Sequence, residues 1–219
     1  MTRKYSTVTG VAAPFVVDDV NTDLIIPIKH CMNTARSELG KFAFEAIRYQ
    51  ASGADNPQFI FNQPQYRGAP ILIAGTNFGC GSSREPAVWA LEGMGIKVII
   101  ARSFGGIFYA NCLRNGLLPI VLPAEAHDLL VGVTSAEPMT LTVDLHTRAI
   151  ILPAGRTLHF DIEPARRRAL LEGLDELDQT LLSLPEIKEF QQLDRTRRAW
   201  VWEPVQAEPG LGTRNRPQP

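Results

Sequence analysis

Residues 70–85, PILIAGTNFGCGSSRE, join an apolar strand to the beginning of a helix. Glycines let a backbone approach a ligand closely, and the first N–H groups of a helix have no partner inside the helix. Two serines and an arginine stand where those N–H groups point outward. The stretch therefore predicts a strand, a glycine turn and a helix start that together bind an anionic substrate.

The segment around this stretch alternates apolar strands with helices. Strands are predicted at residues 71–74, 97–101 and 117–122, and helices at 84–94 and 107–115, each helix followed by a glycine. The strands are apolar throughout, which is typical of strands covered on both faces. A β-α-β-α-β order predicts a right-handed, parallel arrangement.

The flanking segments predict additions to this unit. A strand with a turn at Gly10 is expected over residues 6–17, and apolar residues at helical spacing predict a helix over 39–47. Later, residues 140–145, 148–152 and 157–162 predict antiparallel strands, and 164–171, 175–184 and 186–199 predict helices. The fold class is α/β, with parallel central strands, an antiparallel β layer and C-terminal helices.

Chain length and composition favour one domain. The chain has 219 residues, of which 45% are hydrophobic. A single domain with a C-terminal helical extension is predicted for residues 1–202, and a disordered tail for the proline-rich residues 203–219. The net charge of −1 gives no electrostatic case for binding nucleic acid or a membrane surface.

No apolar run reaches the length of a membrane span, and no apolar segment follows the basic N-terminal residues as in a signal peptide. The three cysteines, Cys31, Cys80 and Cys112, are too few and too widely spaced for a disulfide framework or a metal site. These features predict a cytoplasmic protein with reduced thiols and no metal of its own.

Two motifs carry a resemblance to a known family. Residues 79–85, GCGSSRE, resemble the swivel-domain motif of the aconitase superfamily, and residues 21–27, NTDLIIP, resemble the other hallmark of that domain. Further stretches at 59–65, 89–91 and 115–119 resemble small subunits of bacterial 3-isopropylmalate dehydratases. The similarity runs in order from about Thr9 to Leu184.

The resemblance implies a swivelling β/β/α domain made as a separate chain. Its partner would be a large subunit that carries a [4Fe-4S] cluster, with no cofactor on this chain. The pair would interconvert 2-isopropylmalate and 3-isopropylmalate, both small dicarboxylates, through 2-isopropylmaleate in leucine biosynthesis. This chain alone would be inactive.

The resemblance also assigns roles within the first motif. Ser82 corresponds to a catalytic base acting as an alkoxide, Ser83 to a supporting donor, and Arg84 to a clamp whose planar fork binds a carboxylate. Each has a structural alternative. The alternative for Ser82 is a helix N-cap, for which serine is a preferred residue, and the alternative for Arg84 is a helix-surface ion pair with a carboxylate such as Glu85.

Four further positions correspond to substrate-binding positions of the family. They are Thr22, Asp23, Arg36 and Gly81. Asp23 has the alternative of closing an Asx-turn before Leu24, and Arg36 that of a solvent-facing arginine at a helix start. Gly81 would let the backbone approach the substrate.

The sequence departs from the family at a few places. Pro86 replaces a usual histidine, and Arg36 has unusual neighbours. A hydro-lyase for another alkyl malate, of the citramalate or dimethylmalate type, is therefore an alternative. A non-catalytic anion-binding or assembly module is a second alternative, against which Ser82, Ser83 and Arg84 argue.

Overall fold

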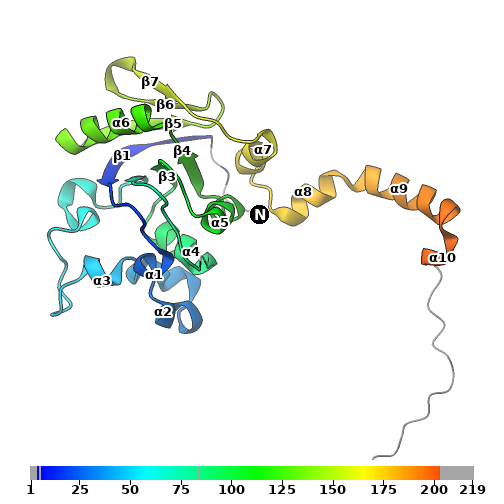
Figure 1. The fold of residues 1–219 in the computed structure, drawn as a ribbon, viewed down its shortest axis with the longest axis horizontal. Helices are drawn as coiled ribbons and strands as arrows, with labels where there is room; N and C mark the ends of the chain where they lie inside the picture. The colour runs from blue at the N-terminus through cyan, green and yellow to red at the C-terminus, as the bar shows by residue number, and fades with distance from the viewer. Residues whose placement is uncertain (1–3, 5, 83, 203–219) are drawn as a thin grey trace, which may run out of the picture. The chain divides into compact units, whose positions relative to one another are not determined.

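The computed structural model describes residues 4, 6–82 and 84–202 (Figure 1). The chain divides into two compact units, Met1–Leu177 and Asp178–Pro219. The single domain predicted for residues 1–202 stays a prediction. The tail predicted for residues 203–219 lies outside the described residues.

The first unit is built on one mixed sheet of seven strands in the order β4-β3-β2-β1-β5-β6-β7. Neighbours among β1 to β4 pair in parallel, and β5 to β7 add antiparallel strands beyond β1. The strands are β1 (Thr7–Phe15), β2 (Ile71–Ala74), β3 (Val98–Ala101), β4 (Leu118–Val121), β5 (Met139–Asp144), β6 (Ala149–Ile151) and β7 (Thr157–His159). The predicted α/β class, with parallel central strands and added antiparallel strands, is confirmed.

Seven α-helices and four short 3-10 segments belong to the described part of the first unit. The helices are α1 (Thr22–Ile25), α2 (Ile28–Asn33), α3 (Glu45–Arg48), α4 (Glu85–Gly93), α5 (Gly106–Asn115), α6 (Ala124–Ala136) and α7 (Pro164–Glu172). The 3-10 segments are η1 (Arg36–Lys41), η2 (Ile60–Asn62), η3 (Pro64–Tyr66) and η4 (Pro153–Gly155). The sequence pattern predicted α4, α5 and α7 near these bounds, but not α1, α2 or α6.

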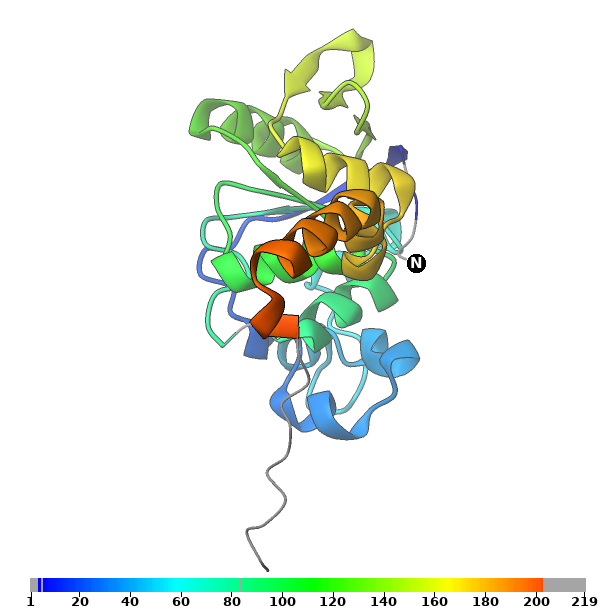
Figure 2. The same cartoon turned by 90° about the vertical axis from the view of Figure 1, so that its right-hand side faces the viewer.

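The sheet separates two apolar cores, because successive side chains of a strand point to opposite faces. Leu72 and Ile99 pack with residues of α4 and α5, whereas Ile71 and Ile100 pack with residues of α6 and α7. Figure 1 and Figure 2 show α4 and α5 on one side of the sheet and α6 on the other. This double cover explains the wholly apolar strands.

The prediction of one continuous helix over residues 39–47 is wrong. The segment forms η1 and then α3, with a break at Phe44, whose φ is 57°. Phe44 is fully buried, and its N–H donates to the carbonyl of Ile25 at 2.8 Å. This tertiary contact overrides the helical pattern.

The turn predicted at Gly10 is also wrong, because Gly10 lies inside β1. A Cβ placed on Gly10 would lie 2.4 Å from Cγ of Pro70. The glycine therefore allows the close approach of the chain that leads into β2.

The second unit is helical in its described residues. α8 (Glu176–Leu182) crosses the boundary between the units, and α9 (Leu184–Arg197) and α10 (Ala199–Trp202) follow. Asp194 is buried, and its carboxylate accepts hydrogen bonds from Nε of Arg198 at 2.6 Å and Nε1 of Trp202 at 3.0 Å. These bonds hold α10 against the end of α9.

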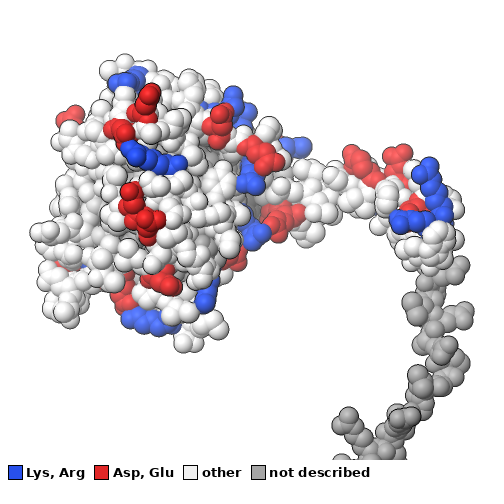
Figure 3. Space-filling view, viewed as in Figure 1, with Lys and Arg blue, Asp and Glu red and all other residues white. Residues whose placement is uncertain are grey.

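Acidic and basic side chains are interspersed over the face of the first unit that Figure 3 shows. This distribution agrees with the near-zero net charge. Across the described residues, no helix combines the length and the apolar character that crossing a bilayer requires.

Candidate active-site hollow at the ends of β1 and β2

The chain brings its two signature motifs together just beyond the carboxyl ends of β1 and β2. The N–H of Gly79 donates to the carbonyl of Val20 at 2.7 Å, and the N–H of Thr22 donates to the carbonyl of Cys80 at 3.0 Å. These bonds continue the parallel pairing of β1 and β2 after both strands have ended. The carboxyl edge of parallel strands is where open α/β sheets bind ligands.

The turn after β2 needs left-handed backbone at alternate residues. Asn77, Gly79 and Gly81 have φ values of 55°, 72° and 88°. A Cβ on Gly79 would lie 2.2 Å from Cγ of Phe108, and a Cβ on Gly105 would lie 2.6 Å from the carbonyl oxygen of Gly79. Glycine is thus required on both sides of this contact. The sequence predicted that the glycines let the backbone approach a ligand, but at Gly79 the missing side chain makes room for Phe108.

The helix after the turn begins later than predicted. α4 starts at Glu85, its N-cap is Arg84, and no side chain caps it. Ser82 lies two residues before the cap, so the interpretation of Ser82 as the helix N-cap is wrong. Pro86 fits the first turn of α4, as expected for proline. Ser83 lies outside the described residues.

Thr22, Asp23, Ser82 and Arg84 line one small hollow. Its volume is about 10 Å³, roughly the room that one water needs. The remaining lining residues are Ile26, Ile28, Cys31 and Ala87. The hollow is therefore too small to enclose a dicarboxylate.

The carboxylate of Asp23 is left available on the exposed side of α1. The Asx interaction at this helix start belongs to Asn21, whose Oδ1 accepts a hydrogen bond from the N–H of Leu24 at 2.8 Å. The alternative of an Asx-turn closed by Asp23 is therefore wrong. Thr22, the first residue of α1, is 4% exposed.

Arg84 forms no ion pair with the described residues. The expected alternative partner, Glu85, instead accepts a hydrogen bond from Nδ2 of Asn115 at 3.2 Å. The interpretation of Arg84 as the surface partner of Glu85 is therefore wrong. The guanidinium is exposed beside the hollow, where it can pair with a carboxylate from outside the chain.

The Cys31 thiol lines the same hollow, where burial and the charges of Arg84 and Asp23 affect its pKa. Burial raises the pKa of the Cys31 thiol, while Arg84 lowers this pKa and Asp23 raises it. The thiol therefore stays protonated near neutral pH. Sequence analysis did not place Cys31 and Ile28 at the site, although both lie one turn apart in α2, directly after the NTDLIIP motif.

Arg36 lies outside the hollow. Its Nη2 pairs with Oε2 of Glu92 at 2.9 Å, and its guanidinium carbon lies 4.9 Å from the centre of the Trp89 ring. These contacts hold η1 against α4, and Arg36 is not among the lining residues of the hollow. The structure therefore brings together Thr22, Asp23, Ser82 and Arg84, but not Arg36, and the predicted substrate contact of Arg36 stays a prediction.

The described residues do not fit an iron–sulfur cluster or another bound metal. No group of three or more His, Cys, Asp and Glu side chains gathers among them. Cys112 is fully buried in the apolar core, and this burial raises the pKa of its thiol well above the usual value. A neutral buried thiol is a poor metal ligand.

Comparisons with known proteins agree with this geometry. The family model of the aconitase C-terminal domain matches residues 2–125. The 3-isopropylmalate dehydratase small subunit of Ruegeria sp. (strain TM1040) is 45% identical over 91% of this chain and 100% of its own length. The protein of the same name from Rhodopseudomonas palustris (strain TIE-1) is 46% identical over 90% of this chain and 99% of its own.

A solved structure extends the likeness to the fold. The crystal structure of a 3-isopropylmalate dehydratase chain from Methanocaldococcus jannaschii superposes with a TM-score of 0.59 and 29% identity. It covers 86% of this chain and 99% of the other. Fold and motifs thus define a domain of the aconitase C-terminal class. The chain belongs to the family of 3-isopropylmalate dehydratase small subunits, which confirms the resemblance of its motifs.

Gly79→Ala should destabilise the protein by about 2–4 kcal/mol, because the new methyl group meets the Phe108 ring in a left-handed backbone. Gly106→Ala is the matched control, because a Cβ on Gly106 meets nothing within 4 Å. Urea denaturation of both variants measures the difference. Equal midpoints would show that the Gly79–Phe108 contact does not constrain the turn.

The hydrogen bond between the turn after β2 and the Asp18 carboxylate predicts that the stability of the protein depends on pH. The N–H of Thr76 donates to the Asp18 carboxylate and holds its pKa below the usual 3.8. A lowered folded-state pKa stabilises the protein above the unfolded pKa, and this stabilisation is lost as pH falls through the folded one. Stability of the natural protein should therefore fall more steeply below about pH 4 than that of Asp18→Asn. Parallel pH profiles of the urea midpoint would contradict this role.

Proposed function

We propose that this chain is the small subunit of a two-chain hydro-lyase that interconverts 2-isopropylmalate and 3-isopropylmalate through 2-isopropylmaleate. Its place would be leucine biosynthesis in the cytoplasm. The observation that carries the proposal is the hollow, where Ser82 and Arg84, which has no ion pair with a described residue, meet Thr22 and Asp23. The length and identity of the match to small subunits support the same reaction.

The reaction requires a base beside a carboxylate-binding group. In dehydration, a base removes the proton from the carbon next to a carboxylate. The electron pair of that C–H bond forms the C=C bond, and the hydroxyl leaves from the adjacent carbon. Rehydration in the opposite sense returns a proton to one carbon and a hydroxyl to the other, so no net water is consumed.

Ser82 is the proposed base, acting as an alkoxide. A serine hydroxyl is a very weak acid, so the alkoxide needs nearby positive charge and N–H donors. Arg84 and the N-terminal end of α4, a helix of nine residues, offer both near Ser82. The Ser82 hydroxyl is exposed and has no hydrogen-bond partner among the described residues, so it is available to a substrate. Ser83 is the proposed supporting donor.

Arg84 is the proposed carboxylate clamp. A guanidinium offers two parallel N–H donors to the two oxygens of a carboxylate, which fixes orientation as well as position. Thr22 and Asp23 face the same hollow from α1. Their roles would be to orient the substrate hydroxyl or a group of the partner, while Gly81 lets the backbone pass close to the substrate.

The other half of the site is proposed to come from a large subunit. The hollow is far smaller than a pocket for a small organic ligand, which typically measures about 300–1,000 Å³, so a second surface must close over it. That subunit would carry the [4Fe-4S] cluster, since the described residues of this chain offer no ligand set for it. Departure of the hydroxyl is therefore assigned to the partner.

The substrate assignment is tested directly by turnover of the reconstituted pair. Arg36 contacts Glu92 and Trp89 and does not line the hollow, so turnover and not its position distinguishes the alkyl groups. We expect hydration of 2-isopropylmaleate to exceed that of 2-methylmaleate and dimethylmaleate in kcat/KM. Preference for a methyl analogue would instead identify a citramalate-type or dimethylmalate-type enzyme.

Ser82→Ala should lower kcat of the reconstituted pair by about 10²–10⁴-fold, the usual contribution of a positioned base. Ser52→Ala, in an exposed turn, is the control and should keep full activity. Size-exclusion chromatography should show normal assembly of both variants. Near-normal turnover of Ser82→Ala would remove Ser82 from the mechanism. Absent turnover of the unaltered pair on every alkylmaleate would favour a non-catalytic module.

Arg84→Lys should raise KM by about tenfold or more, because lysine keeps the charge but loses the two-pronged contact with a carboxylate. Arg148→Lys is the control, since Arg148 pairs with Asp161 on the surface of the antiparallel strands. Steady-state kinetics on 2-isopropylmaleate measures both. An unchanged KM for Arg84→Lys would assign the clamp to another residue.

A further inference from the structure

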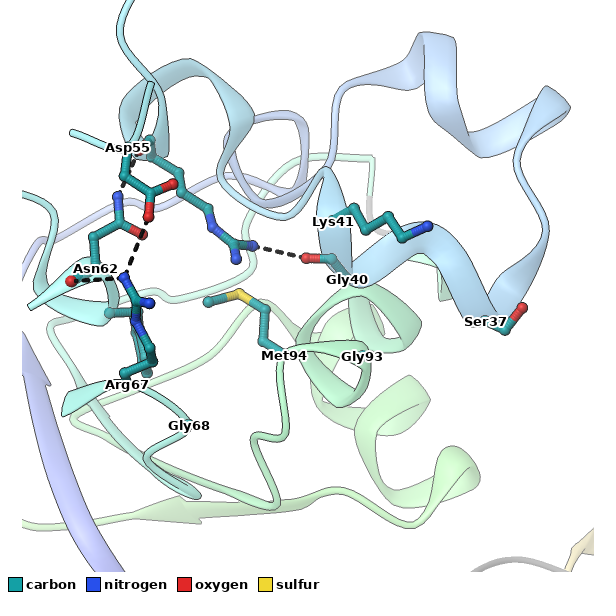
Figure 4. Close-up of a pocket in the computed structure, with 11 residues that line it drawn as sticks. Ser37, Gly40, Lys41, Asp55, Asn62, Arg67, Gly68, Gly93 and Met94 are labelled. Carbon is teal, nitrogen blue, oxygen red and sulfur yellow. Dashed lines mark hydrogen bonds and ion pairs between the residues drawn. The ribbon is translucent and has the colours of Figure 1, made fainter. Parts of the chain in front are cut away.

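A second and much larger cavity lies apart from the hollow. Its volume is about 510 Å³, within the range of small-ligand pockets. It lies between η1, α3, residues 55–68 and the end of α4 (Figure 4). The cavity and the hollow share no lining residue, so a ligand of the cavity is independent of the proposed reaction.

Arg48 gives this cavity an uncompensated positive charge. Its Nη1 donates to the carbonyl of Gly40 at 2.8 Å, and its guanidinium carbon lies 5.3 Å from the centre of the Tyr49 ring. No carboxylate among the described residues pairs with it, and its Nε is buried without a hydrogen-bond partner. A half-buried guanidinium without a counter-ion is unfavourable, and an incoming anion would relieve this cost.

Arg67 supplies a second positive charge that can turn toward an anion in the cavity. Its Nη2 contacts Oδ2 of Asp55 at 3.3 Å, and both side chains are more than half exposed. A long, exposed ion pair is weak, so Arg67 can turn to a stronger partner. Figure 4 shows Asp55 and Arg67 together on one side of the cavity, with Gly40 on the other and Met94 between them. Lys41 also lines the cavity but pairs with Glu38, so the two arginines face one carboxylate, Asp55, in the lining.

The walls of the cavity are built to stay open. A Cβ on Gly40 would lie 2.4 Å from the carbonyl carbon of Gly93, so the two glycines hold η1 directly against the end of α4. Gly68 adds no side chain on the opposite side, and nothing lies within 4 Å of where its Cβ would be. Phe61 and Met94 add apolar surface.

We propose that this cavity binds a small oxyanion, a carboxylate or a phosphate, between Arg48 and Arg67. The guanidinium of Arg48 is the fixed anchor, and Arg67 exchanges its contact with Asp55 for one with the ligand. Met94 and Phe61 then contact any apolar part of an organic carboxylate.

Calorimetric titration of the full chain tests this binding with two probes, inorganic phosphate and 3-methylbutanoate, at constant ionic strength. We expect saturable binding of at least one probe, and the stronger probe identifies the source of the oxyanion. Arg67→Gln and Arg48→Gln should each weaken it tenfold or more. Arg148→Gln is the matched control, because it removes another exposed ion pair, also of 3.3 Å, and it should leave binding unchanged.

Arg67→Gln keeps the test valid if Arg48→Gln does not fold, because Arg67 is exposed. Binding that neither variant weakens would overturn the proposal, as would the absence of saturable binding of both probes. The titration is repeated on the assembled pair. Binding that disappears there would show that a group of the large subunit fills the cavity, which would also overturn the proposal.

Discussion

The backbone pairing between residues 20–22 and 79–80 is the constraint on which the site depends. Two hydrogen bonds, from Gly79 to Val20 and from Thr22 to Cys80, prolong the parallel contact of β1 and β2 beyond the strands. This pairing places α1 and the start of α4 side by side, although their motifs are about sixty residues apart in sequence. Without it, Thr22 and Asp23 would not face the same hollow as Ser82 and Arg84.

The glycines of the turn serve this pairing more than they serve the ligand. Gly79 packs against Phe108 and Gly105, so its missing side chain is a packing requirement, whereas a Cβ on Gly81 would meet Asn21 and Thr22 only at ordinary contact distance. The charged groups of Asp23 and Arg84 are exposed and form no ion pair among the described residues. A site with unsatisfied charges on one wall is suited to completion by a second chain and a dicarboxylate.

The sequence predicted the parallel strands, because wholly apolar runs alternate with segments of helical periodicity. It predicted the meeting of Ser82 and Arg84 with Thr22 and Asp23 through the family motifs. It failed where tertiary contacts decide the backbone. Phe44 breaks a helical pattern because its N–H bonds to Ile25. Sequence spacing also did not reveal the contact of Arg36 with Glu92 and Trp89, which depends on packing of η1 against α4. The predicted substrate contact of Arg36 stays a prediction.

The most direct test of the central claim is a crystal structure of this chain assembled with its large subunit and an alkylmalate. The account predicts the Arg84 guanidinium within hydrogen-bond distance, roughly 2.7–3.2 Å, of a substrate carboxylate, and the Ser82 hydroxyl beside the carbon that loses its proton. A substrate whose carboxylates are held entirely by other residues, with Ser82 and Arg84 facing solvent, would contradict it.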